Sequence, residues 1–131
     1  MSLPNRRWLW ALPIAQMAAI FWASSVSDLP ALPGGVSDKV AHFAAYAVLA
    51  ALADFAAAGG RWAQVNRQSA WRAFLIAAAY GAFDEGHQAF TPRRVASAAD
   101  WVADALGAIT AIALVQLVAM AVGRRAARRG V

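Results

Sequence analysis

The sequence has 131 residues, of which 61% are hydrophobic and 15% charged, and its formal net charge is +5. Soluble domains of this length are seldom so apolar, so the composition favours a membrane protein. The absence of cysteine excludes disulfides and thiolate ligands. We attribute the basic residues to membrane topology and predict no binding to nucleic acid.

Four apolar segments run along the chain, at residues 8–26, 40–58, 70–90 and 98–122. Each is close to the roughly 20 residues that an α-helix needs to cross a bilayer. The intervals contain residues that end helices, such as Pro33, Gly59 and Pro92. We therefore predict one all-α transmembrane domain over residues 1–131, a bundle of four membrane-spanning helices.

The distribution of basic residues predicts how the chain lies in the membrane. Nine of the twelve lie before the first span, around the second interval or after the fourth span: Arg6, Arg7, Arg61, Arg67, Arg72, Arg124, Arg125, Arg128 and Arg129. Cytoplasmic loops carry the excess of basic residues, so we expect a multi-pass protein of the cytoplasmic membrane with both termini in the cytoplasm. The first segment is also compatible with a cleaved signal peptide, because Ala23, Ser24 and Ser25 offer small residues for cleavage.

The second predicted span begins with a polar face. Asp38, His42 and Tyr46 are four residues apart, so their side chains stack along one side of a helix. Asp38 is equally compatible with a structural role as the N-cap of that helix.

Similar polar faces lie at the end of the third span and at the start of the fourth. Helical periodicity groups them as Tyr80, Asp84, His87 and Gln88, with Glu85 to one side, and as Asp100, Asp104 and Gly107. Arg93 and Arg94 lie in the loop between these two spans. Because three helices present polar faces at the same depth, we expect a pocket that opens to the outer leaflet.

Energetic cost makes these residues candidates for function. Inserting a carboxylate within a span costs about 2.5 to 3.5 kcal/mol on insertion scales. These acids must therefore be paired with other groups, hydrated, or retained for a function. The candidate catalytic residues are His42, Asp84, Glu85 and His87. The candidate ligand-binding residues are Asp38, Tyr46, Gln88, Arg93, Arg94, Asp100 and Asp104.

Structural roles compete with these assignments. Ser97 and Asp100 fit a capping box, and Gly107 suits close helix packing. The two loop arginines suit either ligand binding or an ion pair with Glu85 or Asp100. Asp54, at the inner end of the second span, suits pairing with a cytoplasmic arginine such as Arg61 or Arg72, and we assign it no function.

The sequence does not favour a metal site. The side chains of His42 and His87, with nearby carboxylates, have the right chemistry for a divalent ion. However, the chain contains no H-x-x-x-H or E-x-x-H pair. We therefore predict neither a bound metal nor a cofactor.

Taken together, the motifs resemble the VanZ-like membrane proteins, a family named for a protein of glycopeptide-resistance clusters that is linked to teicoplanin resistance. The likeness extends from about Ser24 to Gly107. It lies in Asp38-Lys39-x-x-His42-Phe43-x-x-Tyr46, in Asp84-Glu85-x-His87-Gln88 with Phe90, Pro92 and Arg93, and in Asp100-x-x-x-Asp104-x-x-Gly107. Members of the family often carry Asn where this chain has Asp104. The resemblance implies a fold of four membrane helices and a role in the cell envelope.

Three functions fit this pattern. The first is an outer-leaflet enzyme or binding site for a lipid-linked, phosphate-bearing envelope precursor, in which arginine holds the anion and histidine moves protons. No nucleophile can be identified, so the sequence leaves open whether the protein is an enzyme. The second is a non-catalytic envelope protein that binds a glycopeptide, a lipid or a membrane partner. The third, ion or proton transport, is disfavoured because the inner half lacks a matching polar face.

Overall fold

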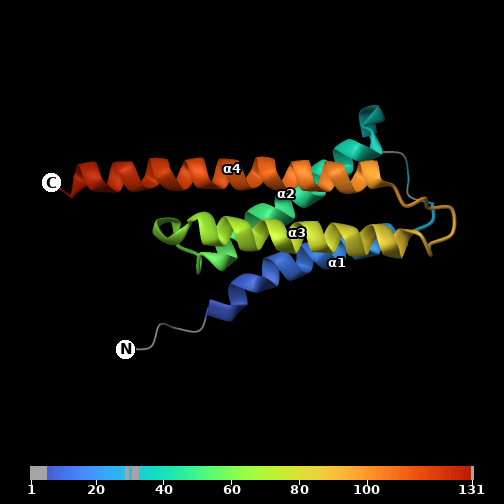
Figure 1. Ribbon diagram of the computed structural model, residues 1–131, viewed down its shortest axis with the longest axis horizontal. Helices are drawn as coiled ribbons and strands as arrows, with labels where there is room; N and C mark the ends of the chain where they lie inside the picture. Colours follow the sequence, from blue (N-terminus) through green and yellow to red (C-terminus); the bar gives the residue numbers. More distant parts are fainter. Residues whose placement is uncertain (1–5, 29, 31–32, 131) are drawn as a thin grey trace.

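The computed structural model describes residues 6–28, 30 and 33–130, and over these residues the chain forms helices and no strands (Figure 1). A short 3-10 helix, η1 (Arg6–Trp10), leads directly into α1 (Ala11–Ser25). The other elements, in chain order, are η2 (Pro33–Gly35), α2 (Asp38–Ala57), η3 (Trp62–Gln64), α3 (Arg67–Gln88) and α4 (Ala98–Arg129). The prediction of an all-α chain with four α-helices is therefore confirmed for the described residues.

The helix ends differ from the prediction most clearly in α4. This helix continues to Arg129, well past the predicted end at Val122. Alanine and arginine are strong helix formers, and the single Gly123 is not enough to end the helix. The arginines at the end of the sequence therefore lie on a regular helix.

Serine side chains determine where α2 and α4 begin. The hydroxyl of Ser37 accepts a hydrogen bond from the backbone N–H of Val40 at 3.4 Å, so Ser37 is the N-cap of α2. The suggestion that Asp38 is this cap was wrong, because Asp38 is already the first residue of the helix. Ser97 caps α4 in the same way, by accepting from the backbone N–H of Asp100.

The helices run alternately in opposite directions, so the start of α1 and the end of α4 lie at the same end of the molecule (Figure 1). Helix α2 packs against the other three helices, most extensively against α4, and α1 packs against α2 and α3. The core is built largely from small residues, which allow the helices to approach closely. Its buried members include Leu49, Ala50, Ala53, Ala73, Ala77 and Ala108.

Helix α4 lies very close to α2 at Gly107. A Cβ atom at this position would overlap the backbone carbonyl of Phe43, so no other residue fits without moving a helix. This agrees with the packing role that the sequence suggested. Because His42 precedes Phe43 on α2, the same approach brings the start of α4 close to His42.

Two helices, α2 and α4, are long and apolar enough to cross a membrane, with mean hydropathies of 1.7 and 2.3. Helix α1 has 15 residues, and α3 carries charged residues at both ends, which lowers its mean hydropathy. Large apolar side chains are exposed on the outer surface, as expected for a protein in contact with lipid. They include Trp22, Phe83, Leu106, Leu117 and Met120.

A buried polar group at the far end of α2 corrects one prediction. Asp54 is 0% exposed and accepts hydrogen bonds from Ser69 Oγ at 2.5 Å and from Gln116 Nε2 at 3.0 Å. The expected pairing of Asp54 with Arg61 or Arg72 was therefore wrong. Neutral donors on α3 and α4 satisfy this carboxylate without bringing a second charge into the core.

Candidate functional site

Polar side chains gather where α1 ends at Ser25, α2 begins at Asp38, α3 ends at Gln88 and α4 begins at Ala98. We call this region the polar end; it lies at the right of Figure 1, opposite the start of α1 and the end of α4. Four helix ends meet here because the helices alternate in direction. Consequently the three polar faces predicted from the sequence lie at one level of the fold.

His42 occupies the centre of the polar end. Its Nδ1 atom lies 2.9 Å from Oδ1 of Asp104 and 4.0 Å from Oε1 of Glu85, and its Nε2 atom lies 3.8 Å from Oδ2 of Asp38. The side chain of Asp104 is completely buried, and those of His42 and Glu85 are only 10% and 12% exposed. Thus α2, α3 and α4 each bring a carboxylate to the same imidazole.

Asp84 belongs to a second group, in which its partners are uncharged side chains. One of its oxygens accepts a short hydrogen bond from the hydroxyl of Ser24, and the other accepts from Nε2 of Gln88 at 3.2 Å. All three side chains are buried. The sequence predicted Asp84 and Gln88 as site residues but not Ser24, which stands in an alanine-rich helix and gave no signal beyond its small polar side chain.

The remaining acids at the polar end have partners other than those predicted. Asp100 accepts from Nζ of Lys39 at 3.1 Å, and Oε2 of Glu85 accepts from the backbone N–H of Ser97 at 2.7 Å. The proposed ion pairs of Glu85 or Asp100 with the loop arginines are absent from the described residues. That expectation was wrong because Lys39 and the start of α4 already occupy these carboxylates.

The two arginines have different surroundings. Arg93 pairs with Asp28 at 2.6 Å, and both side chains are 72% exposed. Arg94 instead donates to the backbone carbonyls of Ala23 and Val26 at the end of α1, at 2.8 and 3.1 Å. Arg94 therefore holds the end of α1 in place, whereas Arg93 keeps a guanidinium at the surface.

His87 lies apart from this cluster. Its Nε2 atom is 2.9 Å from the hydroxyl of Ser25, and its ring stacks on Phe21 with a centroid separation of 4.5 Å. The structure therefore separates the two histidines that the sequence placed in one group. They differ because the side chain of His87 turns toward α1, while that of His42 turns toward α4.

Three buried oxygen atoms have no hydrogen-bond partner among the described residues: the hydroxyl of Tyr46, Oε1 of Glu85 and Oδ2 of Asp104. They come from three different helices and belong to residues at the polar end. Leaving a buried polar atom unsatisfied costs about 1–3 kcal/mol. These atoms are consequently available to an ion, a water molecule or a ligand.

A cavity of about 110 Å³ lies between α1, α2 and α3 at the polar end. Its polar lining consists of Ser24, Asp38, His42, Tyr46, Asp84, Gln88 and Arg94. A larger hollow of about 700 Å³ adjoins this cavity, and Asp38 and Arg94 line both. Asp28 and Arg93 line only the hollow. The cavity thus has room for a small polar group, and the hollow has room for a larger one.

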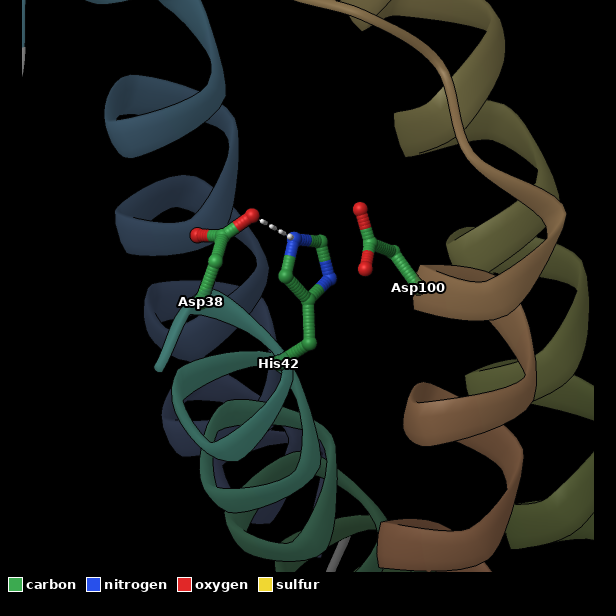
Figure 2. A group of neighbouring side chains, drawn as sticks. All are labelled: Asp38, His42 and Asp100. Carbon is green, nitrogen blue, oxygen red and sulfur yellow. Dashed lines mark ion pairs between the residues drawn. The ribbon is translucent and has the colours of Figure 1, made fainter. Parts of the chain in front are cut away.

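Two sets of side chains have the geometry to hold a metal ion. One is Asp38, His42 and Asp100, and the other is His42, Asp84 and Glu85; within each set the ligand atoms lie within 4.8 Å of one another. Figure 2 shows the first set, with the ring of His42 between the two carboxylates. His42 and Asp84, both candidate catalytic residues, are close enough for one water molecule to bridge them.

Comparison with known families agrees with the resemblance seen in the sequence. The model of the VanZ/LLP1 family matches residues 7–119, and the chain belongs to this family. No curated protein and no solved structure matches it. Family membership and the two long apolar helices together indicate a membrane protein associated with the cell envelope.

Proposed function

We propose that this protein crosses the cytoplasmic membrane four times, with both termini in the cytoplasm and the polar end at the outer leaflet. Nine of the twelve basic residues lie away from the polar end. They are found in η1, between α2 and α3, in the first turns of α3 and at the end of α4. An excess of basic residues is typical of cytoplasmic segments. Residues 6–25 form one continuous helical run, and α3 has 22 residues, so both reach a length close to that of a membrane span.

In this orientation the polar end binds, and acts on, the head group of a lipid-linked, phosphate-bearing envelope molecule. The observation that carries this proposal is the cavity lined by His42 and Asp84, which adjoins the hollow lined by Arg93. A lipid could remain in the membrane beside α1 while its head group occupies the hollow. Arg93 is exposed, so its guanidinium can exchange Asp28 for a phosphate with little loss of stability.

His42 is the residue best placed to hold or move a proton at such a head group. Asp104 fixes the orientation of its ring through Nδ1, which leaves Nε2 on the side of Asp38, a residue that also lines the cavity. A buried carboxylate that orients an imidazole is a common arrangement for proton transfer. The role expected for His87 loses support, because His87 is not among the residues that line the cavity.

Purified protein in detergent provides a direct test. Polyprenyl phosphate should raise the unfolding temperature, whereas the matched polyprenol, which has no phosphate, should not. Arg93→Met should reduce the effect of polyprenyl phosphate, and His87→Phe, outside the cavity, should leave it unchanged. Release of inorganic phosphate would identify the protein as an enzyme, and binding without turnover would favour a non-catalytic role.

An equal response to the phosphate and to the alcohol would contradict the proposal. Stabilisation by a glycopeptide alone would instead support the second function considered from the sequence, that of a non-catalytic envelope protein.

A further inference from the structure

We propose that Asp38, His42 and Asp100 form a binding site for a divalent transition-metal cation, such as Zn²⁺ or Mn²⁺, at the polar end. The three side chains come from the first turns of α2 and α4 and offer three ligand atoms within 4.8 Å of one another. Figure 2 shows a carboxylate on either side of the imidazole ring. This assignment goes beyond the lipid head group proposed above and can be tested without any lipid.

The spacing of the donor atoms suits a shared ion. Nε2 of His42 and Oδ2 of Asp38 are 3.8 Å apart, which is too long for a good hydrogen bond. Two donors bound to one tetrahedral metal at about 2.1 Å each lie roughly 3.4 Å apart. A small rotation of the exposed Asp38 side chain, which is 63% accessible, would bring both atoms to a single ion.

The ring of His42 is already oriented for metal binding. Its Nδ1 atom faces the buried carboxylate of Asp104 at 2.9 Å, and an ionised carboxylate can only accept a hydrogen bond. When Asp104 is ionised, Nδ1 carries the hydrogen of this contact, so in the neutral imidazole the lone pair lies on Nε2, the nitrogen that faces Asp38. Histidines that bind metals commonly donate their other ring N–H to a carboxylate in this way.

The second candidate set, with Asp84 and Glu85, fits less well. Both oxygens of Asp84 already accept hydrogen bonds, from Ser24 and Gln88. The nitrogen of His42 nearest to Glu85 is Nδ1, which is engaged with Asp104. A metal ion in that position would break several buried contacts, whereas in the set with Asp38 and Asp100 only the contact between Lys39 and Asp100 has to give way.

Two buried oxygen atoms near His42 have no hydrogen-bond partner among the described residues. Oε1 of Glu85 is buried without a hydrogen-bond partner and lies 4.0 Å from the ring of His42. The hydroxyl of Tyr46, one turn further along α2, is also unpartnered, and Tyr46 is only 1% exposed. Buried anionic and polar oxygens are stable when paired with a cation or a hydrogen-bond donor. A metal ion, with the water molecules that it binds, would supply both.

The type of ligand identifies the class of ion. One imidazole with two carboxylates suits Zn²⁺, Mn²⁺ or Fe²⁺, whereas Mg²⁺ and Ca²⁺ prefer sets made only of oxygen ligands. Such an ion would also explain how a region rich in carboxylates could attract a phosphate. This last consequence rests on the proposed function, but the metal site itself does not.

Lys39 competes with the ion. Its ammonium lies 3.1 Å from Oδ1 of Asp100, and its side chain is 59% exposed. Asp100 is buried and needs a positive partner, but the lysine itself is exposed, so its ammonium can move into solvent when a metal ion replaces its charge. Removing Lys39 should therefore strengthen metal binding, which a merely damaged protein would not do.

The test is a calorimetric titration of the full chain in detergent, with any affinity tag removed and bound metal stripped with EDTA. Zn²⁺ or Mn²⁺ should bind with one ion per chain. Asp38→Asn, His42→Gln and Asp100→Asn should each abolish saturable binding. Asp104→Asn, which keeps the hydrogen bond to His42 but removes the charge, should weaken it about tenfold to a hundredfold. Asp28→Asn is the matched control, because this acid lies at the same end but outside the set, and it should bind metal normally.

Lys39→Met should bind the ion more tightly than the unaltered chain. Misfolding can only weaken metal binding, so this variant tests the site independently of any damage to the fold. The proposal is overturned if the unaltered chain binds no ion. It is equally overturned if His42→Gln retains full affinity, or if Lys39→Met fails to increase it. Loss of metal binding together with retained, EDTA-resistant binding of polyprenyl phosphate would overturn the metal site alone and leave the proposed function intact.

Discussion

The Nδ1 atom of His42 lies 2.9 Å from Oδ1 of Asp104, although 62 positions separate the two residues in the chain. The contact joins α2 to α4 within a region where the side chain of Asp104 is completely buried. It gives the polar end a buried carboxyl group next to an imidazole. Both the proposed chemistry and the proposed metal site depend on this pair.

Substitutions at Asp104 should separate hydrogen bonding from charge. Asp104→Asn should fold normally, because the amide oxygen can accept the same hydrogen bond from His42. Asp104→Leu should lower the free energy of unfolding by about 1–3 kcal/mol, since it leaves a buried imidazole nitrogen without a partner. Thermal unfolding of both variants in one detergent would measure the difference. Equal stability of the two would show that the contact adds nothing to the fold.

Gly107→Ala should be strongly destabilising, because its methyl group would overlap the carbonyl of Phe43 and push α4 away from α2. Overpacking of this kind typically costs about 1–3 kcal/mol, and rigid backbone on the opposing side places this case at the upper end. Gly123→Ala is the matched control, because no atom lies within 4 Å of the added Cβ. Yield of monodisperse protein after size-exclusion chromatography would compare them. If both glycines tolerate alanine equally, α2 and α4 are not packed as described.

The neighbouring arginines should respond differently to the same substitution. Arg94→Met removes two hydrogen bonds to the end of α1 and should lower the unfolding temperature. Arg93→Met removes only an exposed ion pair, worth about 0–1 kcal/mol, and should leave stability nearly unchanged. Thermal unfolding of the two purified variants checks this order. The reverse order would mean that Arg93 is structural, and would remove the reason for assigning it to a phosphate.

The proposed topology can be tested by cysteine labelling, because the chain has no native cysteine. Val36→Cys, next to the polar end, should react with a membrane-impermeant maleimide in intact cells. Gln64→Cys, in η3, should react only after the cells are permeabilised. Labelling of position 64 alone in intact cells would mean that the protein has the opposite orientation, with the polar end in the cytoplasm.

Much of the helical organisation could be predicted from the sequence. Helix length, apolar composition and the spacing of polar residues are local properties, so the four helices and the polar faces of α2, α3 and α4 were evident from the residues alone. The start of α2 illustrates the limit of such local information. Ser37 and Asp38 are both good caps, and only the observed hydrogen bond shows which one is used.

The partners of the polar residues depended on tertiary structure. From the sequence, His42 and His87 were equal candidates for catalysis, and no local pattern showed which of the nearby acids each histidine would contact. The rotation of each helix about its own axis selects among these partners, and packing between distant segments sets that rotation. Gly107 lets α4 approach α2 closely enough for Asp104 to reach His42, while His87 is turned toward Phe21. Composition and periodicity thus determined which residues would be polar and at which level of the fold they would lie, whereas close packing of small residues decided which of them would touch.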